Sequence, residues 1–194
     1  MRVEMSIPTH DPMVLPENLP TPIDDGKASH LRGLKLPHVA LTATDGTRVD
    51  LSTLPGRTVV YVYPRTGRPG QPLPTGWDGI PGARGCTPQS CSFRDHFGEL
   101  KRLGVAQLFG LSTQDSDYQR EAVERLHLPF ALLSDKDLTL ARALNLPTFE
   151  VDGMTLIKRM AWIVDDGTIS HVFYPVFPPD ESAAQVIDWL QASR

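Results

Sequence analysis

Short apolar runs recur along the chain and are separated by amphipathic segments. Residues 57–63 (RTVVYVY) are β-branched and aromatic without polar alternation, which is typical of a strand buried on both faces. Similar runs follow at residues 105–111, 130–133, 159–164 and 171–177. These runs predict the strands of one sheet.

Helical patterns lie between the runs. Ser116-x-x-Gln119 resembles a capping box and predicts a helix that ends at about His127. Ser134-x-x-Asp137 predicts a second helix, which continues through Leu144. A last helix over residues 180–191 is indicated by one apolar stripe, formed by Ala183, Val186, Ile187 and Leu190.

The order of these elements predicts the fold class. Asp165-Asp166-Gly167 contains the Asp-Gly signal for a tight hairpin between the last two strands. Strands and helices therefore alternate first, and a hairpin and a final helix follow. This order predicts an α/β fold with a central mixed sheet, parallel in one portion and antiparallel at one edge, and helices on both faces.

The first 33 residues differ from the rest. Apolar periodicity is absent there, and prolines, which withhold backbone donors, are frequent: Pro8, Pro12, Pro16, Pro20 and Pro22. We predict an extended Pro-rich N-terminal arm over residues 1–33 and one domain over residues 34–194. The pattern leaves open whether the arm packs on the domain, reaches a partner subunit or is disordered.

A Gly- and Pro-rich insert lies between Pro64 and Cys86. Four of its glycines recur every third residue, but four triplets are too few for a collagen helix, and the Lys-Ser/Thr of a phosphate loop is missing. Loops of this length inside a domain are usually functional. The insert leads directly to the first cysteine.

Composition narrows the functional classes. The chain has 194 residues, 19 Lys+Arg, 23 Asp+Glu, a net charge of −4 and 2 Cys. This mild acidity argues against nucleic acid as a partner, and no apolar run approaches the ~20 residues that span a membrane. An apolar secretory signal is also missing, so we expect a soluble, cytoplasmic protein with reduced thiols. Two cysteines are too few for a disulfide scaffold or a four-thiolate zinc site.

The two cysteines fall on different sides of one predicted helix. Pro88 is tolerated only in a first turn, so this helix should start at about Cys86 or Thr87. Cys86 then shares its face with three apolar residues, Phe93, Phe97 and Leu100, whereas Cys91 lies about 140° away. We therefore expect Cys86 to lie over the apolar face and Cys91 to point outward.

Helix position gives the two thiols different chemistry. The positive end of a helix and nearby cations favour the reactive thiolate form, and Cys86 has that position. Cys91 is placed to capture a sulfenic acid on Cys86 as a disulfide. In a regular helix the two Cα atoms lie more than ~7 Å apart, beyond disulfide reach, so the first turns must unwind. Inert core cysteines are the alternative; a metal site is disfavoured, because only His96 offers a nearby further ligand.

Four segments carry a family resemblance: Tyr63-Pro64, residues 85–95 (GCTPQSCSFRD), residues 110–112 (GLS) and residues 159–165 (RMAWIVD). Together they resemble the peroxiredoxins of the AhpC/TSA family, specifically the bacterioferritin-comigratory (PrxQ-like) branch. The resemblance spans roughly residues 34–190. It implies a thioredoxin-like fold.

The resemblance also implies an activity and its residues. Cys86 would be the peroxidatic cysteine, Cys91 the resolving cysteine, and Arg159 the guanidinium that steadies thiolate and peroxide. The implied reaction reduces hydrogen peroxide and organic hydroperoxides through a Cys86 sulfenic acid and a Cys86–Cys91 intrachain disulfide. Thioredoxin or a glutaredoxin-like donor would recycle the enzyme, which would need no cofactor or metal and act as a monomer or homodimer.

Two further functions remain open. The same disulfide would switch a thiol redox sensor or binding module, and a third possibility is a disulfide reductase acting on other proteins. The chain also departs from the family pattern Pro-x-x-x-Thr-x-x-Cys, because Ala83 stands three residues before Cys86. Pro81 with a backbone group, or Thr66 or Thr75 folding back, would replace that threonine; otherwise activity is reduced.

Three remaining residues have structural interpretations. We expect His96 and His127 to be solvated or to cap helices. Trp77, within the insert, would either cover a pocket or anchor the loop.

Overall fold

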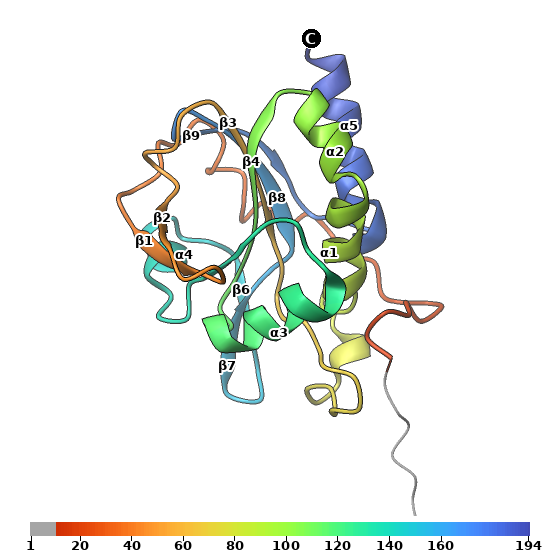
Figure 1. Ribbon diagram of the computed structural model, residues 1–194. Coiled ribbons are helices and arrows are strands. Elements are labelled where there is room, and N and C mark those ends of the chain that lie inside the picture. The colour runs from red at the N-terminus through yellow and green to blue at the C-terminus, as the bar shows by residue number, and fades with distance from the viewer. Residues whose placement is uncertain (1–10) are drawn as a thin grey trace, which may run out of the picture.

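Seven strands form the central sheet of the computed structural model, which describes residues 11–194 (Figure 1). Their order is β2-β1-β5-β4-β3-β8-β9. Strands β3, β4 and β5 are mutually parallel, and β1, β8 and β9 pair antiparallel with their neighbours. The strands are β1 Ala40–Ala43, β2 Arg48–Asp50, β3 Arg57–Val62, β4 Val105–Ser112, β5 Leu132–Ser134, β8 Met160–Asp165 and β9 Thr168–Phe173.

Helices cover both faces of this sheet, so the predicted mixed α/β architecture is confirmed. Alternate residues of β3 contribute to two cores: Tyr61 packs with α1, α2, α3 and α5, and Val60 and Val62 pack with α4. The helices are α1 Cys86–Asp95, α2 Phe97–Arg102, α3 Ser116–Leu126, α4 Thr139–Ala143 and α5 Ser182–Ala192, with 3-10 turns η1 Trp77–Gly79 and η2 Pro179–Glu181. Within residues 11–194, none of the helices is long and apolar enough to cross a membrane.

The apolar runs located the central strands, but two hairpins were missed. One joins β1 to β2, and the other joins β6 (Thr148–Val151) to β7 (Met154–Ile157) as a separate small sheet. Both hairpins are short, which weakens the signal of alternation. The predicted turn between β8 and β9 is confirmed, with Asp166 and Gly167 at φ 47° and 79°.

The predicted capping box of α3 is wrong. Asp115, one residue earlier, is the cap: its Oδ1 accepts a hydrogen bond from the Tyr118 N–H at 2.8 Å. Gln119 is buried and donates to the Ser112 Oγ and the Leu133 carbonyl. The side-chain amide of Gln119 is buried and bonded to two strand residues, so it does not cap the N-terminus of α3.

The helix predicted from Ser134 is much shorter than expected. Helix α4 begins only at Thr139, because the Asp135 carboxylate accepts hydrogen bonds from the N–H groups of Leu140 and Ala141. These bonds satisfy amides at the helix start that have no partner within the helix.

Residues 11–33 of the predicted arm pack on the domain. Near their start, the Asp11 and Val14 carbonyls accept hydrogen bonds from Arg84, which precedes α1. Further along, Ala28 and Leu31 are buried in the core on the α4 face. Residues 1–10 lie outside the described part, and the division at residue 33 stays a prediction.

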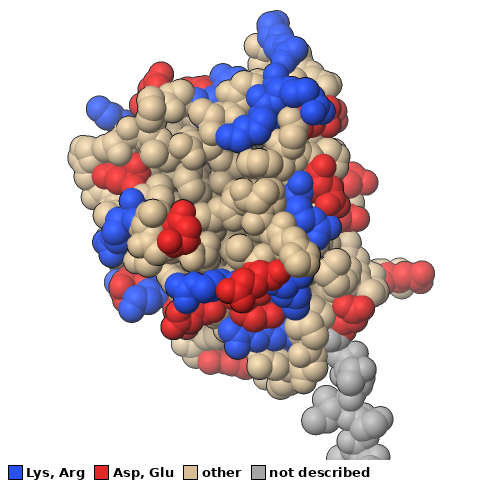
Figure 2. Space-filling view, in the orientation of Figure 1, with Lys and Arg blue, Asp and Glu red and all other residues tan. Residues whose placement is uncertain are grey.

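Charges of both signs are interspersed on the face drawn in Figure 2. Along α3, Arg120 pairs with Asp117 at 2.8 Å and Arg125 pairs with Glu121 at 2.6 Å. The first pair is exposed, and exposed pairs of this kind stabilise a helix by about 0.3–0.5 kcal/mol; the second pair is half-buried.

Gly110→Ala tests the packing of the central strands. A Cβ at Gly110 would lie 2.5 Å from Leu132 Cδ2 and 2.7 Å from the Tyr61 ring. We expect the free energy of unfolding to fall by about 1–3 kcal/mol in urea denaturation. The control is Gly98→Ala in α2, where the nearest atom is 3.6 Å away and alanine should stabilise the helix. Equal stabilities of the two variants would contradict this packing.

Candidate active site

Cys86 is the first residue of helix α1, where the sequence predicted it. The residue before it, Gly85, has φ 103°, and a Cβ there would lie 2.3 Å from Pro179 Cγ. Glycine is therefore required by the backbone conformation and by the close approach of η2. Pro88 occupies the first turn, where its missing N–H costs no helical hydrogen bond.

The sulfur of Cys86 faces two hydrogen-bond donors. Arg159 Nη2 lies 3.3 Å from Sγ and the Arg65 backbone N–H lies 3.4 Å from it. The thiol itself is within 3.5 Å of the Ala83 carbonyl oxygen. Cys86 is only 3% exposed, so these contacts form in a site that largely excludes water.

Strand pairing brings Arg159 to Cys86. Met160 pairs with Val62, the last residue of β3, so Arg159 lies beside the carboxyl end of that strand. The insert that follows β3 then returns the chain to Cys86 at the same edge. Residues 73 positions apart in sequence therefore meet.

The Arg159 guanidinium is buried and held from several sides. Its Nη2 also donates to the Ala83 and Arg84 carbonyls at 3.0 Å, and its Nη1 donates to Gln89 Oε1 at 2.5 Å. Gln89 is itself fixed, because its Nε2 donates to Ser182 Oγ at the start of α5. Sequence reasoning missed Gln89, whose only signal is its place three residues after Cys86 on the same helix.

Cys91 does not point outward as predicted. It is 8% exposed, and the first eight residues of α1 are all buried. The prediction from helix geometry assumed that one side of α1 faces solvent. Instead, α1 is enclosed by the sheet, by η2 and α5, and by the end of α3, where Arg94 donates to the Leu126 carbonyl. Both thiols therefore lie inside the protein, within one intact helix and without a disulfide between them.

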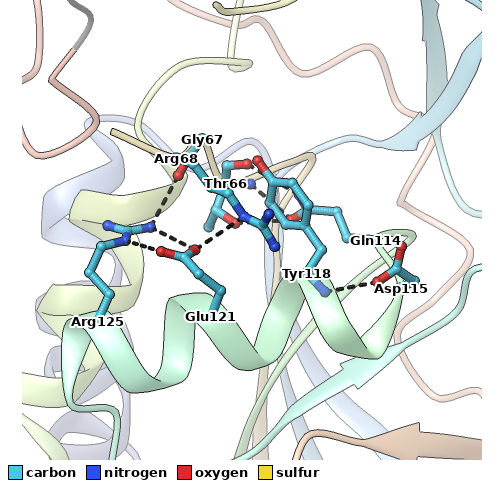
Figure 3. A network of polar contacts seen from close by, with 8 residues as sticks. All are labelled: Thr66, Gly67, Arg68, Gln114, Asp115, Tyr118, Glu121 and Arg125. Atoms are coloured by element: carbon cyan, nitrogen blue, oxygen red, sulfur yellow. Dashed lines mark hydrogen bonds and ion pairs between the residues drawn. The ribbon is translucent and has the colours of Figure 1, made fainter. Parts of the chain in front are cut away.

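The start of the insert is fixed on α3 (Figure 3). The guanidinium of Arg68 lies 4.0 Å from the centre of the Tyr118 ring, a cation–π contact, and that of Arg65 lies 4.9 Å from it. Glu121 lies between Arg68 and Arg125, and Arg125 also donates to the Gly67 carbonyl. These contacts hold the segment that presents the Arg65 N–H to Cys86.

Trp77 anchors the middle of the insert. It is buried against the β6–β7 hairpin, with its ring 6.1 Å from that of Phe149. The β6–β7 hairpin, which the sequence pattern did not predict, thus supports the middle of the insert. Nearer α1, Arg84 forms an ion pair with Asp78 at 2.7 Å.

A backbone N–H group, and not a threonine hydroxyl, contacts the Cys86 thiol. Thr66 is buried with its hydroxyl on Gln114 Oε1 at 3.1 Å. Thr75 is exposed and its N–H donates to Asp152. Neither threonine hydroxyl is placed against Cys86, whose Sγ is contacted instead by the Arg65 N–H.

Comparison with known proteins decides the family. The Redoxin family model matches residues 31–187. Peroxiredoxin Bcp of Escherichia coli K12 is 31% identical over 160 residues, covering 80% of this chain and 92% of the relative. Chloroplastic peroxiredoxin Q of Oryza sativa subsp. japonica is 31% identical over 169 residues, covering 86% and 69%. The chain belongs to the peroxiredoxins.

Solved structures agree with this assignment. Peroxidoxin BcpB of Mycobacterium tuberculosis superimposes with a TM-score of 0.66 at 25% identity, covering 84% of this chain and 97% of that structure. Peroxiredoxin Q of Xanthomonas campestris superimposes with a TM-score of 0.63 at 21% identity, covering 82% and 96%, and supports the fold alone. The expected thioredoxin-like fold is confirmed.

In this peroxiredoxin the two histidines have helix-terminal positions, as expected. His96 ends α1 and its Nδ1 lies 2.8 Å from the Ser92 carbonyl, while His127 ends α3 with φ 53°. Across residues 11–194 the structure contains no cluster of three or more His, Cys, Asp or Glu side chains suited to a metal ion.

Burial raises the pKa of the Cys91 thiol, with smaller opposing effects from Arg94 and Arg125. In the Cys86→Ser variant, we follow alkylation of Cys91 by iodoacetamide as a function of pH. We expect the pH at which the rate is half-maximal to lie above about 8.5, the value for a free cysteine. The same measurement on the urea-unfolded variant is the control. A folded midpoint equal to or below the unfolded one would contradict the burial of this thiol.

Proposed function

We propose that this peroxiredoxin reduces hydrogen peroxide and organic hydroperoxides with Cys86 as the attacking thiolate. Its Sγ attacks the terminal peroxide oxygen, so an S–O bond forms as the O–O bond breaks. The departing alkoxide or hydroxide takes a proton from solvent and leaves as alcohol or water. Cys86 is thereby oxidised by two electrons to a sulfenic acid, and the peroxide is reduced.

The arrangement of donors around the Cys86 sulfur carries this proposal. Arg159 Nη2 and the Arg65 N–H converge on Sγ from two segments, in a buried site. Donors fixed before the reaction stabilise charge on the attacking sulfur and on the departing oxygen without reorganising. The planar guanidinium of Arg159 presents several donors in a fixed geometry, which suits that role.

The second step joins the two cysteines. The Cys91 thiol attacks the sulfur of the Cys86 sulfenic acid, an S–S bond forms and water leaves. Two helical positions five residues apart exceed disulfide reach, so the first turns of α1 must unwind before this step. While the helix is intact, burial raises the pKa of the Cys91 thiol and so disfavours its thiolate form.

A dithiol protein then restores the enzyme. We propose thioredoxin or a glutaredoxin-like donor, whose thiolate attacks the Cys86–Cys91 disulfide and leaves with both its sulfurs oxidised. Two thiols are regenerated, and the cycle requires no cofactor or metal. Such a cycle belongs in a compartment that keeps thiols reduced, for which we propose the cytoplasm.

Replacing each cysteine separates their roles. Cys86→Ser should abolish peroxide reduction, because no sulfenic acid can form. Cys91→Ser should still consume about one equivalent of peroxide but lose turnover with thioredoxin. Mass spectrometry of the peroxide-treated unsubstituted chain should find the 86–91 bridge. Full turnover by Cys86→Ser would refute the assignment, and partner binding without turnover would indicate a sensor.

Arg159→Lys tests the guanidinium. Lysine keeps the charge but cannot reach Sγ and three carbonyl or amide oxygens at once. We expect the second-order rate constant for Cys86 oxidation to fall roughly 10²-fold. Arg57→Lys, at a surface ion pair with Asp165 on the same sheet, is the control and should keep the rate. Equal rates for both variants would rule out the role proposed for Arg159.

A further inference from the structure

Gln114, just beyond the carboxyl end of β4, is buried and binds one residue of the insert, Thr66 (Figure 3). Its Oε1 accepts hydrogen bonds from the Thr66 N–H at 3.0 Å and from the Thr66 hydroxyl at 3.1 Å. Its Nε2 donates to the Thr66 carbonyl at 3.2 Å. These three hydrogen bonds, the Gln114 clasp, hold both backbone polar groups of Thr66.

The main chain of Gln114 is fixed on the central sheet. Its N–H donates to the Ser112 Oγ at 3.3 Å, and its carbonyl accepts a hydrogen bond from the Ser134 hydroxyl at 2.6 Å. Ser112 ends β4 and Ser134 ends β5, and the two residues are paired in the sheet. The Gln114 clasp therefore links the insert to the carboxyl ends of two central strands.

The residue before Thr66 supplies a donor to the reaction site, since the Arg65 N–H lies 3.4 Å from Cys86 Sγ. The Arg65 guanidinium lies 4.9 Å from the centre of the Tyr118 ring, and its Nη1 lies 3.5 Å from Met154 Sδ. These contacts act through a long side chain with many rotamers. The direction of the N–H is instead set by the main-chain dihedral angles on either side of its planar peptide unit.

The main chain is held on both sides of Arg65. Upstream, the Tyr63 N–H donates to the Leu111 carbonyl at 3.0 Å, and the ring of Pro64 restricts φ at the next position. Downstream, the Gln114 clasp holds the residue that follows Arg65. Only the main chain between these two anchors remains to vary, so the anchors together determine where the Arg65 N–H points.

Burial makes the downstream anchor necessary. Thr66 is 0% exposed, so its N–H and carbonyl cannot exchange the Gln114 amide for water where they stand. Without the clasp, the segment has to shift until these two groups find other partners. The adjacent Arg65 N–H then moves away from Cys86 Sγ.

We propose that Gln114 is a positioning residue for the oxidation of Cys86, because its amide holds Thr66 and thereby directs the Arg65 N–H at Sγ. The inference rests on the proposed function and adds a residue that acts through the main chain of residues 65 and 66. A donor that is already in place stabilises charge on the reacting atoms without reorganising. A side-chain amide suits this task, because it offers an acceptor and a donor to the two polar groups of one residue.

Gln119 is the matched comparison for this role. It is also buried, and its Nε2 donates to the Ser112 Oγ at 2.9 Å and to the Leu133 carbonyl at 2.8 Å. Both of these partners lie in central strands and not in the insert. Loss of the Gln119 amide therefore removes buried hydrogen bonds without releasing the insert.

Gln114→Met removes the amide while keeping an unbranched side chain of similar length. We expect the second-order rate constant for Cys86 oxidation by hydrogen peroxide to fall roughly tenfold, because one donor at Sγ is misplaced but not deleted. Gln119→Met is the control and should keep the rate constant within about twofold, although it also loses two buried hydrogen bonds. Equal losses in the two variants would show a merely structural role and overturn the inference.

Amide hydrogen exchange of the reduced protein, followed residue by residue by NMR, reports the positioning without any peroxide. The Arg65 amide should exchange roughly tenfold or more faster in Gln114→Met than in the unsubstituted chain, and should keep its original rate in Gln119→Met. Amides of β3 should stay protected in both variants, which shows that the fold is intact.

The two measurements separate this inference from the proposed function. If Gln114→Met leaves either the Arg65 exchange rate or the rate constant for oxidation unchanged, while the unsubstituted chain reduces peroxide, the inference alone is overturned. An unsubstituted chain that reduces no peroxide would overturn the proposed function, and this inference with it.

Discussion

Two thiols five residues apart in one α-helix cannot form a disulfide, and the site depends on this limit. Cys86 and Cys91 both lie within α1, whose first eight residues are buried. Disulfide formation therefore requires the best-packed part of that helix to unwind. In the proposed cycle, the intact helix reacts with peroxide, and the unwound helix allows the reaction between the cysteines.

The packing around the start of α1 determines how stable the intact form is. Gly85 is enclosed by Pro179 of η2 and by Leu15 of the arm. Arg84, the residue before Gly85, donates hydrogen bonds to two carbonyl groups of the arm. Arg159 stabilises the same turn through the Ala83 and Arg84 carbonyls and through Gln89. Arm, insert and η2 thus converge on one helical turn, and each contact must be lost or rearranged when the helix opens.

The residue pattern predicted the central strands and the first residue of α1, and the family resemblance implied that Arg159 lies beside Cys86. These features depend on local signals: a continuous apolar run, a proline that fixes a first turn, and a family motif. The burial of Cys91 was not predictable, because it results from how α3, α5 and η2 enclose the helix. The insert was recognised as a long loop, but its anchors on Tyr118 and on the β6–β7 hairpin are long-range contacts.

Hydrogen exchange across α1 tests the required unwinding most directly. Amides of residues 89–91, the first in α1 with helical acceptors, should be protected in the reduced protein and should exchange rapidly once peroxide treatment has formed the 86–91 bridge, while those of β3 and β4 stay protected. A bridged protein in which residues 89–91 kept the protection of the reduced form would contradict the unwinding on which the proposed cycle depends.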